Sequence, residues 1–434
     1  MDFFDKLIDE LNKLPKGYIS RKHINGKTYF YLQNRRARRI ESKYIKREDL
    51  EQIREGLEKR EKLEKLLDEL VNNGKDLKKI SLRDEELTGF VMSGNQIVAK
   101  VNHDIIEWKN DNAPLIFTRS KYLSSFLQKR VIDEDRVNSR LLKKALKMTS
   151  IEPSKIPLYV YGAVVTDNYW FKPSGSRVIY EDIKFQNDTY ADLSLSGDYR
   201  FTPKKPKNTP QLTLVGSYEK CWKLIDGIWW LYKAQSENEI FSEIFCSRFA
   251  EVLGIPTAYY ERDGKYIRSR NFADSFNFEP ISSLAGEDDS YENVFNVCFK
   301  LGKDIAKQYI LLIYFDTIVE NVDRHNENLG VMRNKKSGKI VSLAPNFDNN
   351  VALISRVNVL NEDRSRCGMC SMFVKFLKTN KDAFTIFKSI DLKDIDENDL
   401  LYCFDFKHEK VDKNNIISFV LNGLKFIKEI LENK

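Results

Sequence analysis

Long apolar runs are scarce in this chain of 434 residues. The longest, residues 309–315, is far shorter than the ~20 apolar residues that a membrane-spanning helix needs. The first residues, M-D-F-F-D-K-L-I-D-E-L, are acidic where a signal peptide is basic, and they lack its apolar segment. We therefore expect a cytoplasmic protein that does not associate with a membrane.

Metal-ligand patterns are also missing. Of the six cysteines, only Cys367 and Cys370 have the spacing of a ligand pair, and no second pair completes a four-ligand zinc site. The four histidines form no cluster along the chain. We expect ordinary reduced thiols rather than a zinc or redox centre.

The common nucleotide-binding strings are absent. The chain contains no G-x-G-x-x-G, no Walker lysine string, and neither the His-Arg-Asp nor the Asp-Phe-Gly of common protein kinases. A Rossmann enzyme, a P-loop NTPase and a protein kinase of the common type are therefore not indicated.

Acidic residues are scarce between residues 16 and 47. This segment holds eleven basic residues and one acid, Glu41, which gives it a net charge of +10. The whole chain has a net charge of +7, so the remainder carries −3. A strongly basic module on a mildly acidic chain favours a polyanionic partner, and we expect nucleic acid. A basic adaptor or dimerisation arm is the alternative.

The basic segment is predicted to fold as a small sheet. An amphipathic helix over residues 3–14 precedes three strands over residues 17–20, 27–33 and 37–45, and Asn25-Gly26 is a strong hairpin turn. A charged helix over residues 47–73 has leucines at nearly heptad spacing, so it either forms a homodimer or packs on the body of the protein.

Two groups of side chains indicate how this sheet would bind nucleic acid. Four arginines flank the second hairpin turn: Arg35, Arg36, Arg38 and Arg39. Tyr29 and Tyr31 share one face, where they either pack on the helix or stack on bases. We expect salt-sensitive binding to duplex DNA.

A set of carboxylates and amides gathers near residues 316–350. A long helix over residues 293–320 leads to Asp323, Arg324 and His325, Asn328 follows, and Asp348 comes after a hairpin over residues 330–343. Phosphoryl transfer needs one carboxylate to accept or orient the proton of the attacking hydroxyl. It also needs an amide and a second carboxylate to hold Mg²⁺ against the phosphates of ATP. Asp323 suits the first role, and Asn328 and Asp348 suit the second. A buried Asp-Arg pair beside a hairpin is the alternative.

The order of these residues resembles the HipA-like kinases, whose catalytic loop reads D-x-H-x-x-N and whose metal carboxylate follows Pro-x-Tyr/Phe. The matching strings are residues 323–328 and Pro-Asn-Phe-Asp at residues 345–348. Thr-Asp-Asn-Tyr-Trp at residues 166–170 is similar to a group of kinase-like proteins of low-GC Gram-positive bacteria. The loop also looks like that of phosphatidylinositol kinases. The resemblance is strongest from about residue 117 to residue 359. Arg324 and His325 are expected to orient the loop.

The resemblance implies a nucleotide lobe with further site residues. Residues 211–233 are expected to form three strands, with Asp226-Gly227 as a hairpin turn. Gly216 and Ser217 lie where the family has its phosphate loop, in which a serine can be autophosphorylated. Lys233 would meet the ATP phosphates and pair with Glu239, with Glu243 as the second choice of partner. The alternatives are a plain turn, an edge-strand lysine and a helix-start acid.

We therefore predict an α+β, bilobal protein-kinase-like fold with an N-terminal three-stranded sheet and long helix. The expected parts are the arm (1–46), the charged helix (47–75), a connecting α/β region (76–205) with helices over residues 117–150, the nucleotide lobe (206–272) and the helical catalytic lobe (273–434). The predicted activity is an ATP- and Mg²⁺-dependent serine/threonine-type protein kinase, in a toxin, defence or regulatory role. A lipid or small-molecule kinase and a pseudokinase that works through its basic arm are the alternatives.

Overall fold

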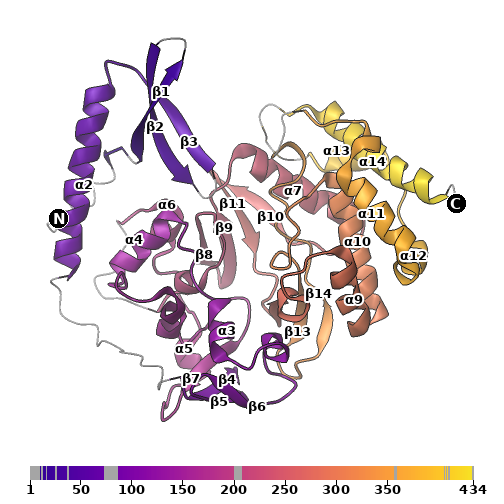
Figure 1. Ribbon diagram of the computed structural model, residues 1–434, viewed down its shortest axis with the longest axis horizontal. Helices are drawn as coiled ribbons and strands as arrows, with labels where there is room; N and C mark the ends of the chain where they lie inside the picture. The colour runs from indigo at the N-terminus through magenta and orange to yellow at the C-terminus, as the bar shows by residue number, and fades with distance from the viewer. Residues whose placement is uncertain are drawn as a thin grey trace. The chain divides into compact units, whose positions relative to one another are not determined.

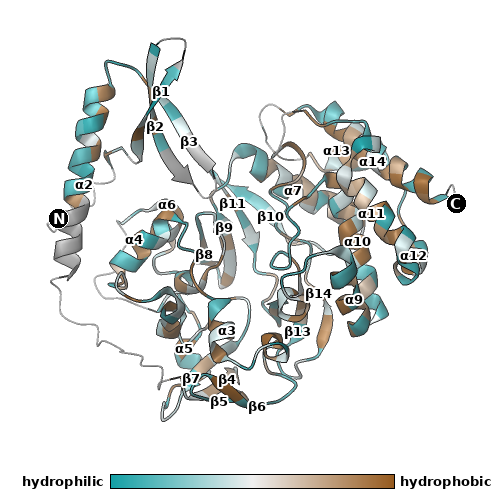
Figure 2. Cartoon of the chain, in the orientation of Figure 1, coloured by the Kyte–Doolittle hydropathy of each residue, from teal (hydrophilic) through white to brown (hydrophobic). Residues whose placement is uncertain are grey.

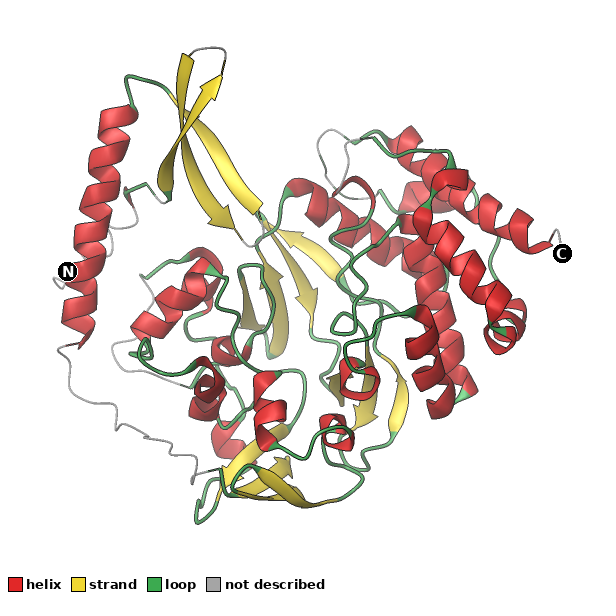
Figure 3. Cartoon of the chain, in the orientation of Figure 1, coloured by secondary structure: helices red, strands yellow, loops and turns green. Residues whose placement is uncertain are grey.

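The computed structural model describes residues 10, 13–15, 17–24, 27–36, 39–72, 87–199, 208–355, 359–404, 406, 408 and 411–432. Helices alternate with several small antiparallel sheets, so the predicted α+β class is confirmed (Figure 3). The chain divides into two compact units. The first comprises Met1–Gly89, Leu127–Val164 and Trp170–Ala234, and the second comprises Phe90–Phe126, Val165–Tyr169 and Gln235–Lys434. The predicted five-part division stays a prediction.

The first unit begins with the predicted three-stranded sheet. Its strands β1 (Tyr18–Ile24), β2 (Lys27–Arg36) and β3 (Arg39–Ile45) are antiparallel and lie in that order (Figure 1). The first strand is longer than predicted, and the third is present from Arg39 onward, since residues 37 and 38 lie outside the described residues. The predicted helix over residues 3–14 falls largely outside the described residues.

Helix α2 (Leu50–Asn72) confirms the predicted charged helix. One of its heptad positions, Leu63, packs on a buried apolar cluster formed by α4 (Val137–Ala145), η3 (Pro153–Val160) and α6 (Ala191–Ser196). Leu63 therefore packs on the body of the protein, which is one of the two predicted roles of this helix. Pairing of α2 with a second copy stays a prediction.

The predicted helical stretch over residues 117–150 is shorter and broken. Only α3 (Leu123–Gln128) and α4 are α-helical in it. Between them the chain turns and buries Arg136, whose guanidinium donates to the carbonyl oxygens of Leu214 at 2.9 Å and Lys220 at 3.3 Å. Further short elements of the chain are η2 (Leu115–Thr118), β7 (Tyr169–Pro173) and α5 (Tyr180–Ile183).

The hairpin of β8 (Lys220–Ile225) and β9 (Ile228–Lys233) closes the first unit. Its turn is Asp226-Gly227, with φ of 51° and 77°, which confirms the predicted turn. The strand predicted before this hairpin is wrong. Pro210–Thr213 forms a 3₁₀ helix (η4) instead, because Pro210 is preorganised for a helical start and the Thr209 side chain caps the Gln211 N–H at 3.3 Å.

The strands of the second unit form small antiparallel groups. Strands β6 (Ile105–Lys109), β5 (Gln96–Asn102) and β4 (Gly89–Ser93) are neighbours in that order, and β10 (Tyr260–Asp263) pairs with β11 (Tyr266–Arg270). Strands β12 (Phe276–Pro280), β13 (Gly330–Asn334) and β14 (Ile340–Leu343) form a third group. The predicted hairpin over residues 330–343 is therefore confirmed.

The helices of the second unit are α7 (Glu237–Val252), α8 (Ser282–Ala285), α9 (Tyr291–Leu301), α10 (Lys303–Val319), α11 (Gly368–Thr379), α12 (Lys381–Lys388), α13 (Glu397–Tyr402) and α14 (Lys413–Glu432). Of these, α10 leads to the candidate site and packs against α9, α11, α12 and α14. The single helix predicted over residues 293–320 is wrong. Gly302 separates α9 from α10 with a φ of 144°, which a side chain would disfavour.

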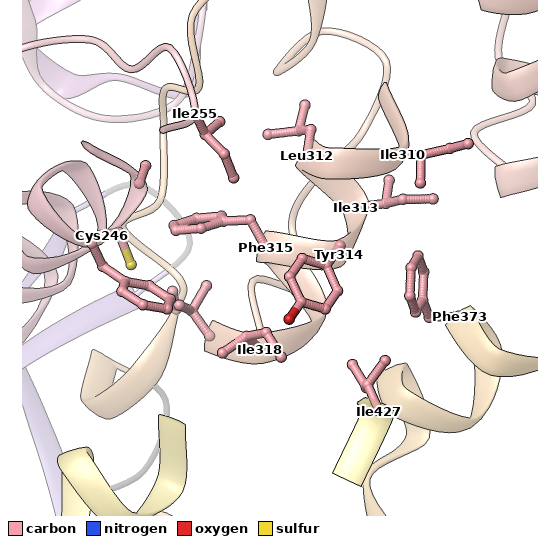
Figure 4. Close-up of a cluster of buried hydrophobic side chains, with 14 of the residues drawn as sticks. Cys246, Ile255, Ile310, Leu312, Ile313, Tyr314, Phe315, Ile318, Phe373 and Ile427 are labelled. Atoms are coloured by element: carbon pink, nitrogen blue, oxygen red, sulfur yellow. The ribbon is translucent and has the colours of Figure 1, made fainter. Parts of the chain in front are cut away.

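Apolar side chains bury α10 on nearly all sides. The side chains of Ile310, Ile313 and Phe315 are at most 1% exposed. Phe373 of α11 and Ile427 of α14 lie in the same cluster (Figure 4). Figure 2 shows the contrast with α2, whose coloured residues are mainly hydrophilic. All six cysteines are buried in the described parts of the two units. No helix among the described residues is both long and apolar enough to cross a membrane.

Candidate active site

Helix α10 ends where the candidate catalytic loop, residues 321–328, begins. Glu320 adopts a left-handed conformation with φ of 50°, and the Asn321 N–H donates back to the Asp316 carbonyl at 2.9 Å. The loop then bonds to itself around Asp323, whose carbonyl accepts from the His325 N–H at 2.9 Å. The buried helix therefore fixes where this loop starts.

Asp323 lies half-buried in the middle of this loop. Its N–H donates to Asn321 Oδ1 at 3.4 Å and its carbonyl is used by the loop. No described residue donates a hydrogen bond to its carboxylate oxygens. The carboxylate is consequently free to accept a proton or a hydroxyl hydrogen from a bound molecule.

Arg324 is buried and forms a bidentate ion pair with Asp316 of α10. Its Nε lies 2.9 Å from Asp316 Oδ2 and its Nη2 lies 3.0 Å from Oδ1, and the two side chains are 6% and 1% exposed. Burial alone would lower the pKa of the Arg324 guanidinium. The Asp316 carboxylate more than offsets this, so the pKa is raised above its ordinary value and the group stays charged.

The same guanidinium joins the catalytic loop to the segment that carries Asp348. Its Nη1 donates to the carbonyl oxygens of Asn328 at 2.8 Å and Phe347 at 2.5 Å. Both oxygens therefore lie around the same nitrogen atom. Its Nη2 donates to the side-chain oxygens of Asn346 at 2.7 Å and Asn349 at 2.8 Å. Arg324 therefore brings the two candidate metal ligands, Asn328 and Asp348, into one neighbourhood.

Asn328 presents its amide oxygen rather than its nitrogen. It is 8% exposed, its Nδ2 donates to the Asp323 carbonyl at 3.1 Å and its N–H donates to the His325 carbonyl at 2.9 Å. Its Oδ1 accepts no hydrogen bond from a described residue. An oxygen left over in this way is the atom that Mg²⁺ prefers as a ligand.

Asp348 has an unusual backbone. Its φ of 61° lies in the left-handed region, which is uncommon for residues other than glycine and which clusters at functional sites. Its N–H donates to the Tyr260 hydroxyl of β10 at 3.0 Å. On either side, Asn346 forms a parallel bridge with Thr257, and the Asn349 N–H donates to Glu243 Oε2 of α7 at 2.8 Å.

Two buried amide groups beside Asp348 have unused donors. Asn346 and Asn349 are 2% and 0% exposed, and each places its Oδ1 on Arg324. Their Nδ2 atoms make no hydrogen bond among the described residues. Buried donors are rarely left unpaired in folded proteins, so this pair suits an oxygen-rich ligand.

His325 is exposed and supports the loop backbone. Its Nδ1 accepts from the Glu327 N–H at 3.2 Å. This contact fits the predicted orienting role, which stays a prediction.

The predicted phosphate-loop residues lie before β8 in the first unit. Gly216 has a φ of 105°, and a Cβ there would lie 2.3 Å from Lys220 Nζ, which donates to the Val215 carbonyl at 3.0 Å. Ser217 is half-buried. Lys233 is 4% exposed and ends β9 opposite Lys220. The positive φ of Gly216 is a conformation that glycine adopts readily. The role of Gly216 in binding phosphate stays a prediction.

Glu239 lies at the start of α7, in the second unit. One carboxylate oxygen accepts from the Ser236 N–H at 2.8 Å and from Ser236 Oγ at 2.7 Å, while the Glu239 N–H donates back to Ser236 Oγ. This reciprocal capping box gives the residue the helix-start role that was the alternative. Its predicted pairing with Lys233 stays a prediction.

Sequence reasoning missed three members of the site, Asp316, Asn346 and Asn349. Asp316 is a lone carboxylate inside the apolar run of α10, and such a residue is almost never fully buried without a partner. That signal could have identified it as the partner of Arg324. Asn349 carries no such signal, because Asp348-Asn349-Asn350 reads as an ordinary turn.

The described residues contain no group of three or more His, Cys, Asp or Glu side chains that could hold a metal ion. Any cation here would depend on Asp348 and on the amide oxygen of Asn328.

Comparisons with known proteins match the chain in part. Residues 4–55 match the family model described as a domain of unknown function (DUF6788). None of the curated proteins matches. Among solved structures, the Helicobacter pylori proinflammatory kinase CtkA is similar with 18% identity and a TM-score of 0.39, over 49% of this chain and 91% of that chain. A chain from the Shewanella oneidensis MR-1 toxin–antitoxin complex of HipA, HipB and operator DNA is similar with 12% identity and a TM-score of 0.47, over 79% and 99%.

Proposed function

We propose that this protein is a phosphotransferase that moves the γ-phosphoryl group of ATP to a hydroxyl group of a protein, with Mg²⁺. The observation that carries the proposal is the bonding of the buried Arg324 side chain to the carbonyls of Asn328 and of Phe347, the residue before Asp348, together with the bond from the Asn328 amide to the Asp323 carbonyl. A purely structural Asp-Arg pair would explain the burial and pairing of Asp316 and Arg324. It does not explain why the Asp323 carboxylate and the Asn328 amide oxygen are left without donors.

The residues around Asp348 fit a magnesium-bound triphosphate. A carboxylate and an amide oxygen are hard oxygen ligands of the kind that Mg²⁺ takes, and Mg²⁺ sites commonly use only one or two protein ligands. The unpaired Nδ2 donors of Asn346 and Asn349 suit oxygens of phosphate or of metal-bound water. When bound, the metal would neutralise charge on the phosphates. Asp348 and Asn328 are the residues that would hold it.

Asp323 is the residue that would act on the acceptor. In the transfer, the acceptor oxygen forms a bond to the γ-phosphorus, the bond to the ADP oxygen breaks, and the hydroxyl proton passes to the Asp323 carboxylate. Catalysis in this class depends on position and electrostatics more than on covalent chemistry of the protein. Arg324 serves that need as a positioning residue, because it holds both ends of the site.

The sequence indicates further candidate residues for binding ATP, and several of them lie in the first unit. Lys233 is the candidate contact for the α- and β-phosphates, and Gly216 and Ser217 are candidates for a phosphate loop. Glu239 is the candidate partner of Lys233, in addition to its capping role.

Two other functions make different predictions. A lipid or small-molecule kinase would transfer label from ATP but would not label protein. A pseudokinase would bind nucleotide weakly or not at all, and would not transfer phosphate. The unshielded Asp323 carboxylate favours an active enzyme over a pseudokinase.

Incubation with γ-labelled ATP and a heat-treated cell extract tests the proposal. We expect Mg²⁺-dependent labelling of protein by the wild type and its loss in Asp323→Asn and Asp348→Asn. Asp304→Asn removes the same charge from an exposed position of α10 and should label normally. A shift in melting temperature by ATP and Mg²⁺ in the wild type but not in Asp348→Asn would separate nucleotide binding from transfer. Equal labelling by all four proteins would refute the assignment.

A further inference from the structure

The register of the N-terminal sheet sorts its side chains onto two faces. Cross-strand partners share a face and neighbours along a strand alternate. Tyr31 lies opposite Ser20 on β1 and Tyr44 on β3, and Tyr29 lies opposite Lys22. Tyr18 lies opposite Gln33, two residues beyond Tyr31, and so belongs to the same face. We call the set Tyr18, Lys22, Tyr29, Tyr31 and Tyr44 the tyrosine face.

Three rings of the tyrosine face pack on one another, and two of its rings are exposed. The Tyr44 ring lies 6.2 Å from Tyr29 and 5.8 Å from Tyr31, centroid to centroid, in tilted and edge-on arrangements. Lys22 Nζ lies 5.0 Å from the centroid of Tyr31. Even so, Tyr44 is 51% exposed and Tyr18 is 49% exposed. Mutual packing holds the rings of Tyr29, Tyr31 and Tyr44 together and still leaves Tyr44 about half exposed.

The opposite face has an apolar character that explains why the tyrosines face outward. It carries Phe30 opposite Ile45, and Ile45 is 2% exposed. The sheet thus buries Ile45 on one face and leaves the Tyr18 and Tyr44 rings about half exposed on the other. Contiguous exposed rings on a small domain mark an interaction site more often than a neutral surface.

The charge around these rings limits the partner. Lys22 and Lys27 are exposed cations of the tyrosine face, and Lys46 and Arg47 are exposed in the turn after β3. Arg21 and Lys43 are also exposed, but they lie opposite Phe30 and Leu32 on the other face. The whole segment 16–47 carries +10 with one acid. A ligand that satisfies both features must present repeated negative charge and flat, unsaturated rings at once.

We propose that the tyrosine face binds single-stranded nucleic acid, with bases stacked on Tyr44 and Tyr18 and phosphates held by Lys22 and Lys27 of that face and by Lys46 and Arg47 after β3. Base-on-aromatic stacking with a basic groove is how proteins bind unpaired strands with little sequence preference. A duplex hides its base faces within the stack and offers only phosphates and groove edges, so it would use the charges and not the rings. An acidic protein would likewise leave the rings without a role.

Fluorescence anisotropy on the full chain tests this proposal. The probes are labelled dT20, a 20-base-pair duplex, and polyphosphate as a competitor that has charge without bases. We expect dT20 to bind more tightly than the duplex, and polyphosphate to compete poorly. The double variant Tyr18→Ala/Tyr44→Ala should weaken dT20 binding roughly 10- to 100-fold, while duplex binding changes less than about threefold. Tyr44→Phe keeps the ring and should retain binding of dT20.

The result that would overturn the proposal is equally specific. Binding of dT20 within about twofold of wild type in the double alanine variant, or preference for the duplex, would show that the rings are not used. Because both rings are half-exposed, circular dichroism and the melting temperature should be unchanged by the substitutions, which separates lost binding from lost folding. The test does not depend on phosphotransferase activity.

Discussion

The N-terminal sheet and the catalytic loop use the same kinds of side chain in opposite environments. In the sheet, Lys22 and Lys43 are exposed, and such charges contribute little to stability. In the loop, Arg324 is 6% exposed and satisfied by Asp316 and by carbonyl and amide oxygens. Burial decides which role a cation has. An exposed cation is available to a ligand, whereas a buried one organises the residues around it.

Asp323→Asn tests the loop side of this contrast and should have the largest effect. The amide keeps the shape of the side chain but cannot accept the hydroxyl proton. We expect phosphoryl transfer to fall by about 10²- to 10⁴-fold, with the melting temperature unchanged. The initial rate of label transfer from γ-labelled ATP is the measurement, and Asp304→Asn is the charge-matched control. A rate close to wild type would exclude Asp323 as the base.

Arg324→Met should break the organisation of the loop itself. The substitution leaves the buried Asp316 carboxylate without its charge partner, so the free energy of unfolding in urea should fall by about 3–5 kcal/mol. Arg262→Met removes an ion pair with Glu237 whose partners are 30% and 59% exposed, and should cost less than about 1 kcal/mol. Asp316→Leu combined with Arg324→Met should recover part of the lost stability without recovering activity. Equal losses in the two single variants would contradict the contrast between buried and exposed cations.

Charge reversal in the sheet should have a different signature from loss of its rings. Glutamate at Arg35, Arg36, Arg38 and Arg39 should weaken binding of dT20 by more than about 100-fold at low salt, and should flatten the slope of log affinity against log salt by up to ~0.7 per lost phosphate contact. Tyr44→Ala should weaken binding and leave this slope unchanged. Both variants should transfer phosphate at the wild-type rate. If Tyr44→Ala also changed the slope of log affinity against log salt, separate roles for the arginine charges and the tyrosine rings would be contradicted.

Glu239→Gln should have the smallest effect and distinguishes two roles for one buried carboxylate. Glutamine can replace glutamate in a capping box, so the free energy of unfolding should change by less than about 1 kcal/mol. If the charge also positions Lys233, transfer should fall by about tenfold with stability retained. The rate of label transfer and urea unfolding of the same preparation give both readouts. An unchanged rate would leave capping as the role of Glu239.

The sequence was informative where a local pattern determines the outcome. The turn at Asp226-Gly227 and the hairpin over residues 330–343 follow from local conformational preference, and both are present. Gly302 is also a local signal. It was overlooked because the apolar pattern continues across it from α9 into α10.

Features that depend on distant partners could not be predicted in the same way. The Arg324 network joins residues of α10, the loop and the segment after β14, and nothing in the spacing of these residues indicates that one guanidinium contacts all of them. Likewise the sequence places Tyr29 and Tyr31 on one face, but the contribution of Tyr44 depends on the pairing of β2 with β3.

The central claim is that the residues gathered by Arg324 transfer phosphate from ATP. Transfer of label from γ-labelled ATP to protein, measured side by side for wild type, Asp323→Asn and Asp304→Asn at saturating Mg²⁺, tests it most directly. The account predicts labelled protein with the wild type and Asp304→Asn, a loss of at least about 10²-fold with Asp323→Asn, and no labelling by any of them when Mg²⁺ is chelated. Labelling by Asp323→Asn at the wild-type rate, or no labelling by a folded wild type that binds ATP and Mg²⁺, would contradict it.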